Sequence, residues 1–203
     1  MARKADPDKK DNIIRAAVRV FALKGYAATR IIDVARAAGI GKGTIYDYFK
    51  SKEDLFFAVF QQVTQEAQTP VLAALTAHHG SVSAKLKAMA ESLVLFWLDK
   101  IELYALTMEF WSATTVHVGR ERFKAAFQTA YETFRQELAA LIREGVSKGE
   151  FSPECHPYEV SSGLIGMLDA LVLQAWLDSN FDALKTARAC LDSLLRGLEA
   201  PTK

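Results

Sequence analysis

The segment AGIGKGTIYDYFKSKEDL, residues 38–55, contains a helix end, a short helix and a new helix start. Gly39 can adopt the positive φ that ends a helix, and Ile40 can then pack back beneath that helix. A second helix can begin near Lys42. Residues 51–54 have the Ser/Thr-x-x-acid pattern of a helix N-terminus, with acidic groups in the first turn. This order of signals predicts a helix-turn-helix.

Two helices are predicted up to Gly39. The first follows a loose basic arm over residues 1–8 and ends at Gly25, because its apolar residues recur at helical spacing. Thr29 is the predicted N-cap of the second helix. The inward residues are expected to be Ile13, Ala16, Ala17, Val20 and Phe21, with Leu23 as a further candidate, and then Ile31, Val34, Ala35 and Ala38.

The third helix is predicted over about residues 42–49, and its faces follow from a rotation of about 100° per residue. If Ile45 and Phe49 face inward, four residues face outward and two lie on the flanks. A helix this short is marginal alone, so its neighbours must hold it in place. The outward residues are Gly43, Thr44, Tyr46 and Asp47, and the flanking ones are Lys42 and Tyr48.

Length and charge suggest two domains with different partners. The chain has 203 residues, half of them apolar, and a net charge of +1. Residues 1–52 contain twelve Lys or Arg against five Asp or Glu, a net charge of +7, which leaves −6 for residues 53–203. A basic N-terminal segment favours binding to a polyanion such as DNA. The alternative is an ordinary solvated basic face.

The cysteine pattern and the apolar runs point to a soluble cytoplasmic protein. Cys155 and Cys190 are far apart and belong to no Cys-x-x-Cys pair, which fits a reduced compartment. The N-terminus has no apolar segment typical of a signal peptide. The longest apolar runs, such as residues 93–98, are shorter than the roughly 20 residues that span a bilayer. No membrane association is therefore expected.

The rest of the chain has only helical periodicity, which predicts an all-α protein of about nine helices. A fourth helix starts near Ser51 and runs to Leu72 or beyond, where Pro70 should kink or interrupt it. Asp182 is the expected cap of the last helix. The other helices are predicted over residues 81–98, 101–113, 120–147 and 158–177, with the last one reaching about residue 198.

The first third of the chain carries a long spaced pattern without gaps. Its residues are Ile13-x-x-Ala16-Ala17, Phe21, Gly25-Tyr26, Thr29, Asp33-Val34-Ala35, Ala38-Gly39-Ile40, Gly43-Thr44-Ile45-Tyr46, Tyr48-Phe49 and Ser51-Lys52-Glu53-Asp54-Leu55. This pattern resembles the tetracycline-repressor family of bacterial transcriptional regulators, and residues 168–174 also look like the penultimate helix of several members.

The resemblance implies a helix-turn-helix DNA-binding domain over residues 1–52 and a helical effector-binding and dimerisation domain over residues 53–203. It also implies a homodimer formed through the last two helices. The implied phosphate contacts are Thr29, Thr44, Tyr46, Tyr48 and Lys52, and the implied base-facing residues are Lys42, Gly43 and Asp47.

The base-facing residues have the chemistry for reading DNA. Lys42 could donate to guanine O6 or N7, and Asp47 could accept from cytosine N4. For Asp47, an ion pair with a nearby Lys or Arg is an equal alternative. Ile32 stands where the family more often has a polar residue, so Arg30 is the better candidate for a groove or phosphate contact.

Aromatic residues between Phe96 and Trp176 are interpreted either as plain core or as the lining of an effector pocket. The family resemblance favours a pocket for an apolar or aromatic small molecule. Asp169 interrupts an apolar helix, and a structural role is favoured over ligand contact. The predicted ligand-binding residues are Tyr104, Met108, Trp111, Phe127, Tyr131 and Met167, with Thr107, Glu109, His117, Asp169 and Gln174 as polar candidates. Glu109 could equally face water.

Two apolar stripes near the C-terminus are candidates for the dimer interface. Small residues recur four apart in the penultimate helix, which permits close helix approach, and leucines line one face of the last helix. The alternative is that both stripes complete the monomer's own core. The predicted interface residues are Ser162, Gly166, Ala170, Leu173, Leu177, Leu191, Leu194, Leu195 and Leu198, and Leu184 extends the second stripe.

These observations predict a ligand-responsive dimeric repressor that binds a palindromic DNA operator. An effector-independent activator or architectural protein is the alternative. An enzyme is disfavoured, because no nucleophile with a spaced His and acid, no phosphate loop and no metal-ligand spacing is found in the sequence. His78-His79 and Cys155-His156 are adjacent pairs that do not share a helical face. No cofactor is expected.

Overall fold

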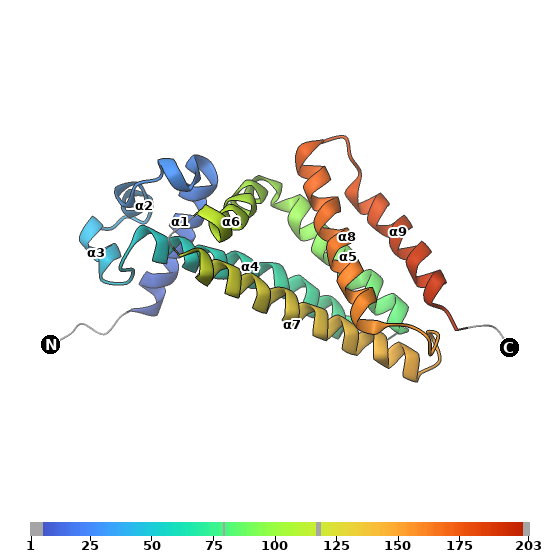
Figure 1. Ribbon diagram of the computed structural model, residues 1–203. Helices are drawn as coiled ribbons and strands as arrows, with labels where there is room; N and C mark the ends of the chain where they lie inside the picture. The colour runs from blue at the N-terminus through green and yellow to red at the C-terminus, as the bar shows by residue number, and fades with distance from the viewer. Residues whose placement is uncertain (1–5, 79, 117–118, 201–203) are drawn as a thin grey trace. The chain divides into compact units, whose positions relative to one another are not determined.

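The computed structural model describes residues 6–78, 80–116 and 119–200, and its regular structure is helical (Figure 1). Within those residues it has nine α-helices, one short 3-10 helix and one isolated bridge between Phe151 and Glu199. The all-α prediction is therefore confirmed. Residues 1–5 of the predicted arm, His79 and His117 lie outside the described residues.

The chain forms two compact units. The head unit comprises residues 1–66 and 105–124, and the body unit comprises residues 67–104 and 125–203. The helices α4 (Lys52–Ala77) and α7 (Arg120–Ser147) have residues in both. Helix α6 (Tyr104–Val116) belongs almost entirely to the head unit. The functional boundary between residues 52 and 53 stays a prediction.

The head unit begins with α1 (Pro7–Ala28), whose N-cap is Asp6. The Asp6 carboxylate accepts from the backbone N–H of Asp8 at 3.1 Å, and Pro7 suits the first helical position. The predicted inward residues are buried, which confirms this face. Leu23 is 84% exposed, so its inclusion was wrong: the helix surface turns by about 200° between Phe21 and Leu23.

The turn after α2 (Ile31–Ala37) is the one predicted from Gly39. Gly39 has φ +68°, its N–H donates to the Arg36 carbonyl at 3.2 Å, and the Ile40 N–H donates to the Ala35 carbonyl at 3.0 Å. The Asn12 side chain donates to the Ala38 carbonyl at 3.1 Å. These bonds hold the end of α2 against α1 and aim the chain into α3 (Lys42–Tyr46).

The predicted N-cap of α2 was one residue early. The N-cap is Arg30, whose N–H donates to the Asp33 carboxylate at 3.0 Å. Thr29 is instead buried, and its hydroxyl donates to the Gly25 carbonyl at 2.7 Å. Gly25 has φ +75° inside α1, and this sharp corner places its carbonyl within reach of the Thr29 hydroxyl.

Aromatic rings form much of the head unit's core. Phe56 lies 5.1 Å from Phe21, 4.9 Å from Phe110 and 5.7 Å from Phe123 between ring centroids. Phe110 and Phe123 come from α6 and α7, so these two aromatics are plain core of the head unit. Packing of this kind anchors α4 and α6 to α1.

Helix α4 starts as predicted, because the Ser51 hydroxyl oxygen accepts from the Asp54 N–H at 3.0 Å. It continues through Pro70 to Ala77, so the expected interruption at Pro70 was wrong. Proline removes one backbone hydrogen-bond donor from a helix of 26 residues, and the hydrogen bonds of the other turns are enough for the helix to continue. A kink at Pro70 stays a prediction.

In the body unit, α5 (Val82–Asp99), α8 (Pro157–Leu177) and α9 (Ala183–Leu198) lie side by side (Figure 1). The 3-10 helix η1 (Ile101–Leu103) contacts both α5 and α8. The core between these elements is aliphatic. Its residues include Val82, Leu86, Met89, Val94, Leu138, Ile142, Leu164, Leu168, Leu171, Leu191 and Leu195.

Among the described helices, α8 is long and apolar enough to cross a membrane when judged by length and composition only. The sequence predicted that no apolar segment is long enough to span a bilayer. Helix α8 reaches 21 residues because small residues such as Gly and Ser lie between its large apolar ones. It is weak evidence for a membrane segment. Leu164, Leu168 and Val172 are buried in the body unit, and the core helix of a globular domain passes the same test.

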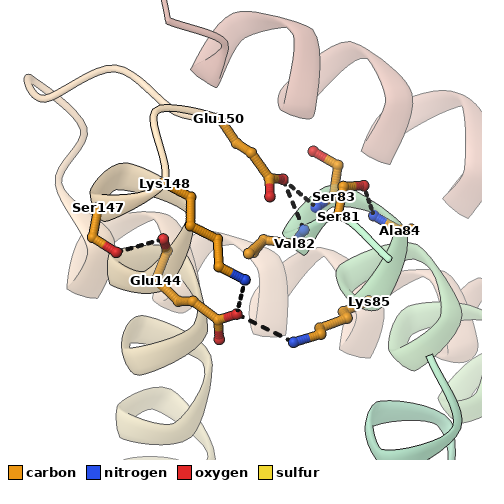
Figure 2. A network of polar contacts seen from close by, with 9 residues as sticks. All are labelled: Ser81, Val82, Ser83, Ala84, Lys85, Glu144, Ser147, Lys148 and Glu150. Atoms are coloured by element: carbon orange, nitrogen blue, oxygen red, sulfur yellow. Dashed lines mark hydrogen bonds and ion pairs between the residues drawn. The ribbon is translucent and has the colours of Figure 1, made fainter. Parts of the chain in front are cut away.

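A polar network joins the end of α7 to the start of α5 (Figure 2). The Glu150 carboxylate accepts from the Val82 N–H at 2.7 Å and from the Ser83 N–H at 3.4 Å, so it caps α5. Glu144 binds Lys148 at 2.6 Å and Lys85 at 3.2 Å, and these two lysines hold the pKa of its carboxyl below the usual value. Gly149, with φ +74°, turns the chain so that Glu150 can reach α5.

Candidate nucleic-acid interface and effector site

The two faces of α3 are those predicted from the sequence. Ile45 and Phe49 are buried, at 0% and 5% exposure, and hold the short helix against the rest of the head unit. The helix ends at Tyr46, earlier than expected, although the Phe49 N–H still donates to the Ile45 carbonyl at 2.9 Å. On the other face, Lys42, Gly43, Tyr46 and Asp47 are exposed, while Thr44 and Tyr48 are half-buried.

The exposed face of α3 presents a cation, an aromatic ring with a hydroxyl and a carboxylate. The Lys42 ammonium lies 5.8 Å from the centre of the Tyr46 ring, which keeps these two side chains together. Asp47 forms no ion pair with any other residue that the structure describes, so the alternative of an internal pair is not supported. These groups are free to meet a ligand such as DNA.

Two of the hydroxyl groups among the predicted phosphate contacts have internal partners. The Thr29 hydroxyl is buried against Gly25, so its side chain stabilises the corner after α1 and is not part of the exposed face. The Tyr48 hydroxyl oxygen accepts from the Asp6 N–H at 3.1 Å. Its own hydrogen has no partner among the described residues, so Tyr48 can position the start of α1 and still donate to a phosphate.

Lys52 and Arg30, the two basic candidates outside α3, have different surroundings. The Lys52 ammonium donates to the Ala27 carbonyl at 3.3 Å and lies 4.3 Å from the centre of the Tyr26 ring. Burial lowers the pKa of Lys52, and the nearby Glu109 carboxylate opposes that shift. Arg30 is exposed and its side chain is available, whereas Ile32 is 44% exposed and can only offer an apolar contact.

Glu109 has a role that the sequence did not indicate. Its carboxylate accepts twice from the Tyr26 backbone N–H, at 2.7 Å and 3.0 Å. It also lies close to Gly25, where the positive φ turns the Tyr26 N–H outward. Eighty-three residues separate the partners, so no local pattern could have predicted this bond. Helix α6 is thereby tied to the corner between α1 and α2 within the head unit.

In the body unit, Asp169 lies next to two tyrosines. The Tyr131 hydroxyl donates to the Asp169 carboxylate at 2.6 Å, and the Tyr104 hydroxyl donates to the Asp169 carbonyl at 3.5 Å. Burial raises the pKa of Asp169, and the bond from Tyr131 only partly opposes this. Burial and the nearby Asp169 charge also raise the pKa of Tyr104 to about 12.

The two tyrosines that bond to Asp169 contact further aromatic rings. The Tyr104 ring centre lies 5.8 Å from that of Trp97 and 5.9 Å from that of Trp176, and Phe127 lies 6.4 Å from Tyr131. Met167, also predicted, packs against the body core. The structure thus brings four predicted ligand residues into one unit with Asp169. They are Tyr104, Phe127, Tyr131 and Met167.

The other two predicted ligand residues, Met108 and Trp111, belong to the head unit. Trp111 is 37% exposed, and Met108 is half-buried. Thr107, next to Met108 on α6, has a buried hydroxyl with no hydrogen-bond partner among the described residues. A ligand role for Met108 and Trp111 stays a prediction.

The predicted dimer residues divide into an exposed set and a buried set. On α8, Gly166, Ala170 and Leu177 are exposed, with Leu177 at 69%, and Ser162 and Leu173 are half-buried. On α9, Leu191 and Leu195 are buried at 2% and 3% exposure in the body core, so they do not lie on the exposed surface expected of a dimer interface. Their alternative assignment, to the monomer's own core, is the one observed. Leu194 and Leu198 remain partly accessible.

Two family models match the chain. Residues 13–59 match the model described as bacterial regulatory proteins, tetR family, and residues 82–198 match the model of the C-terminal part of BetI-type transcriptional repressors. The first covers the helix-turn-helix, and the second covers more than half of the chain.

Individual transcriptional regulators are similar to this chain over nearly its whole length. The transcriptional regulator BetI of Cronobacter sakazakii is 27% identical over 94% of this chain and 90% of its own. The regulator FadR of Bacillus subtilis, solved with stearoyl-CoA, has a TM-score of 0.76 at 22% identity, covering 93% of this chain and 99% of its own. A regulator from Saccharomonospora viridis, solved with choline, has a TM-score of 0.76 at 21% identity, covering 94% and 97%.

Proposed function

The chain belongs to the TetR family of bacterial transcriptional regulators, and from that premise we propose that it is a dimeric repressor released from DNA by a small molecule. The observation that carries the proposal is the face of α3. Lys42, Tyr46 and Asp47 are exposed on a helix that Ile45 and Phe49 hold in place. Such a helix can enter the major groove with its free side chains toward the bases.

On DNA, the exposed groups divide by chemistry. Lys42 donates to guanine and Asp47 accepts from cytosine, while Gly43 allows close approach of the backbone to the groove. Thr44, Tyr46 and Tyr48 donate hydroxyl hydrogens to phosphates, and basic side chains add charge neutralisation. The basic side chains that bind phosphates in this set are those of Arg30 and Lys52.

Dimerisation uses the exposed stripe of α8. Gly166 and Ala170 permit another helix to approach closely, and Leu177 offers apolar area that is 69% exposed among the described residues. Leu173, Leu194 and Leu198 extend this surface. Two copies of the helix-turn-helix then read a palindromic operator with half-sites about 34 Å apart or somewhat more.

The effector binds in the body unit beside Asp169. FadR of Bacillus subtilis and the Saccharomonospora viridis regulator were solved with stearoyl-CoA and choline, each of which carries an alkyl part and a charged part. Tyr104, Phe127, Tyr131 and Met167 supply the apolar or aromatic contacts. The chain acts in the cytoplasm as a regulator and performs no catalysis.

Helix α6 is the proposed route of coupling, together with a swing of α4. The same helix carries Tyr104, which contacts Asp169, and Glu109, which binds the Tyr26 N–H. These residues are five positions apart, about 7.5 Å along the helix axis. An effector that favours one position of Tyr104 therefore biases the bond at Glu109, provided that it binds the DNA-incompetent state better.

Nuclease footprinting upstream of the protein's own and neighbouring genes tests the proposal. We expect a symmetric protected site that is lost when a small molecule is added. Protection without two-fold symmetry would contradict the dimeric repressor. Symmetric protection that no small molecule relieves would instead favour an effector-independent regulator.

A further inference from the structure

The Tyr48 hydroxyl connects the end of α3 to the start of α1. Its oxygen accepts from the backbone N–H of Asp6 at 3.1 Å, across 42 residues of sequence. Asp6 is the N-cap of α1, and its carboxylate is used within the same turn, where it accepts from the Asp8 N–H. The bond to Tyr48 therefore fixes the point at which the chain enters α1, beside the residues that follow α3.

Tyr48 lies at the edge of the face that is proposed to meet DNA. It is half-buried, whereas Tyr46 and Asp47 just before it are exposed. When a recognition helix lies in the major groove, hydroxyl groups at the edge of its face meet the sugar-phosphate backbone. That backbone separates the major groove from the minor groove. The chain therefore enters α1 at the rim of the major groove, where the minor groove begins.

The residues that precede Asp6 carry the charge that such a place requires. Residues 1–5 contain Arg3 and Lys4 and no acidic side chain. A chain advances by at most about 3.6 Å per residue, so the three positions from Asp6 to Arg3 can span about 10 Å. This reach is sufficient for a minor groove that is about 6 Å wide. A narrow groove of A·T base pairs also has an enhanced negative potential that attracts arginine.

The competing partners for these two basic residues are the carboxylates of Asp8 and Asp11. Both are exposed in the first turns of α1, and neither forms an ion pair with another residue that the structure describes. An exposed ion pair contributes only about 0–1 kcal/mol in water. Binding to DNA gains more, because each neutralised phosphate releases condensed counterions. The operator is therefore the favoured partner whenever α3 is docked.

From these observations we infer that residues 1–5 bind the minor groove of the operator beside each α3 site, with Arg3 in the groove and Tyr48 as the residue that positions the segment. The inference rests on the proposed docking of α3 and adds a second DNA contact to it. Two consequences distinguish it from docking by α3 alone. Operator affinity depends on the charges of residues 3 and 4, and it depends on base pairs next to those that α3 contacts.

The first experiment compares the full chain with its Arg3→Ala/Lys4→Ala variant on two duplexes. Both duplexes carry the footprinted operator, and the base pairs beside the α3 sites are all A·T in one and all G·C in the other. We expect the variant to lose about tenfold in affinity for the A·T duplex and clearly less for the G·C duplex. The dependence of log affinity on log salt should become shallower by about 2 per protomer.

Arg143→Ala/Lys185→Ala is the matched control. It removes the same charge from exposed positions on α7 and α9, in the body unit, and should leave affinity, salt dependence and the preference for A·T unchanged. Methylation of adenine N3, an atom of the minor groove, reports the contact directly. The wild type should protect this atom from dimethyl sulfate beside the α3 sites, and the Arg3→Ala/Lys4→Ala variant should not.

A second experiment tests the role of Tyr48. Tyr48→Phe removes the acceptor of the Asp6 N–H, whereas Tyr46→Phe removes a proposed phosphate donor and leaves that bond intact. The Arg3→Ala/Lys4→Ala change should therefore cost less than half as much affinity, on the logarithmic scale, in the Tyr48→Phe background as in the Tyr46→Phe background. Circular dichroism checks that both tyrosine variants fold.

Three results would overturn the inference. Unchanged affinity of the Arg3→Ala/Lys4→Ala variant would exclude the contact, and an equal loss on both duplexes would exclude the minor groove. An equal cost in the two tyrosine backgrounds would exclude Tyr48 as the positioning residue. Failure of the wild type to bind any operator would contradict the proposed function as well. Specific operator binding that is indifferent to residues 3 and 4 would support that function and contradict only this inference.

Discussion

Glu109 in the head unit and Asp169 in the body unit are both carboxylates in apolar helices, yet their surroundings differ. Glu109 accepts from the Tyr26 N–H with both oxygens and has the Lys52 ammonium near it. Asp169 accepts from one neutral hydroxyl and has no cation among the described residues. The first carboxylate is satisfied by the chain and stabilises a corner. The second is not, and an under-compensated charge of this kind is a sign of a ligand site.

The largest effect is expected from Glu109→Ala. The change leaves the Tyr26 N–H without its acceptor at the Gly25 corner, and a hydrogen bond to a charged group contributes about 1.5–3 kcal/mol. Urea unfolding should show this loss in the free energy of unfolding. Operator affinity should also fall, since the corner positions α2.

Glu102→Ala is the matched control for Glu109→Ala, because Glu102 is exposed just before α6 and should tolerate the change. Equal free energies of unfolding for Glu102→Ala and Glu109→Ala would contradict the stabilising role assigned to Glu109. The carboxylate of Glu109 would then be an ordinary polar side chain.

Asp169→Asn is expected to change stability by a smaller amount and to increase it. Burial raises the pKa of Asp169 in the folded state, so the unfolded chain ionises first as pH rises above the ordinary value of 3.8. The folded state therefore loses stability across the window between 3.8 and the raised pKa, and the loss persists at neutral pH. The variant should melt a few degrees higher than the wild type at pH 7 and no higher near pH 3.

Differential scanning calorimetry at both pH values checks this prediction. Among the described residues, the titratable groups that bond to Asp169 are the Tyr131 hydroxyl, at its carboxylate, and the Tyr104 hydroxyl, at its backbone carbonyl. Both remain neutral over the whole range because burial raises their pKa values. A lower melting temperature of Asp169→Asn at pH 7 would mean that the chain already compensates the charge.

The smallest effect is expected from Glu91→Gln. Arg188 donates to both oxygens of Glu91, at 3.0 Å and 2.8 Å, and this bond lowers the pKa of Glu91. The side chains of the pair are 54% and 32% exposed, so solvent screens their interaction. The stability that the pair contributes is present above the ordinary pKa of a glutamate and disappears as pH falls. The pH dependence of stability is therefore opposite to that expected from Asp169. The variant should melt slightly lower at pH 7 and identically near pH 3.

A gain in stability for Glu91→Gln at pH 7 would contradict this assignment. The expected order of the three carboxylates runs from Glu109, which stabilises the fold most, through Glu91 to Asp169, which destabilises it. Calorimetry on all three variants under one set of conditions gives that order directly.

The local parts of the fold could be predicted from the sequence. The turn at Gly39, the cap at Ser51 and the inward pair of Ile45 and Phe49 depend on residues at most five positions apart, and all are confirmed. Helical spacing likewise predicted the bounds of α5, α7, α8 and α9 closely. The family resemblance then gave the class of protein.

The distant contacts could not be predicted. The bond between Glu109 and Tyr26 spans 83 residues, and nothing near either residue indicates the other. Leu191 and Leu194 belong to the same leucine stripe, yet only Leu191 is buried in the core, because its neighbours come from α5 and α8. The cap at Arg30 instead of Thr29 depended on the Gly25 carbonyl, which competes for the Thr29 hydroxyl.

Quantitative binding of Lys42→Ala to the footprinted operator and to all its single-base variants tests whether the exposed face of α3 reads the operator. We predict that discrimination at one base position in each half-site falls by about 1–3 kcal/mol, while discrimination at the other positions and the stability of the protein stay unchanged. An equal loss of affinity for every sequence would make Lys42 a phosphate contact. Unchanged affinity for all of them would contradict the proposed docking face.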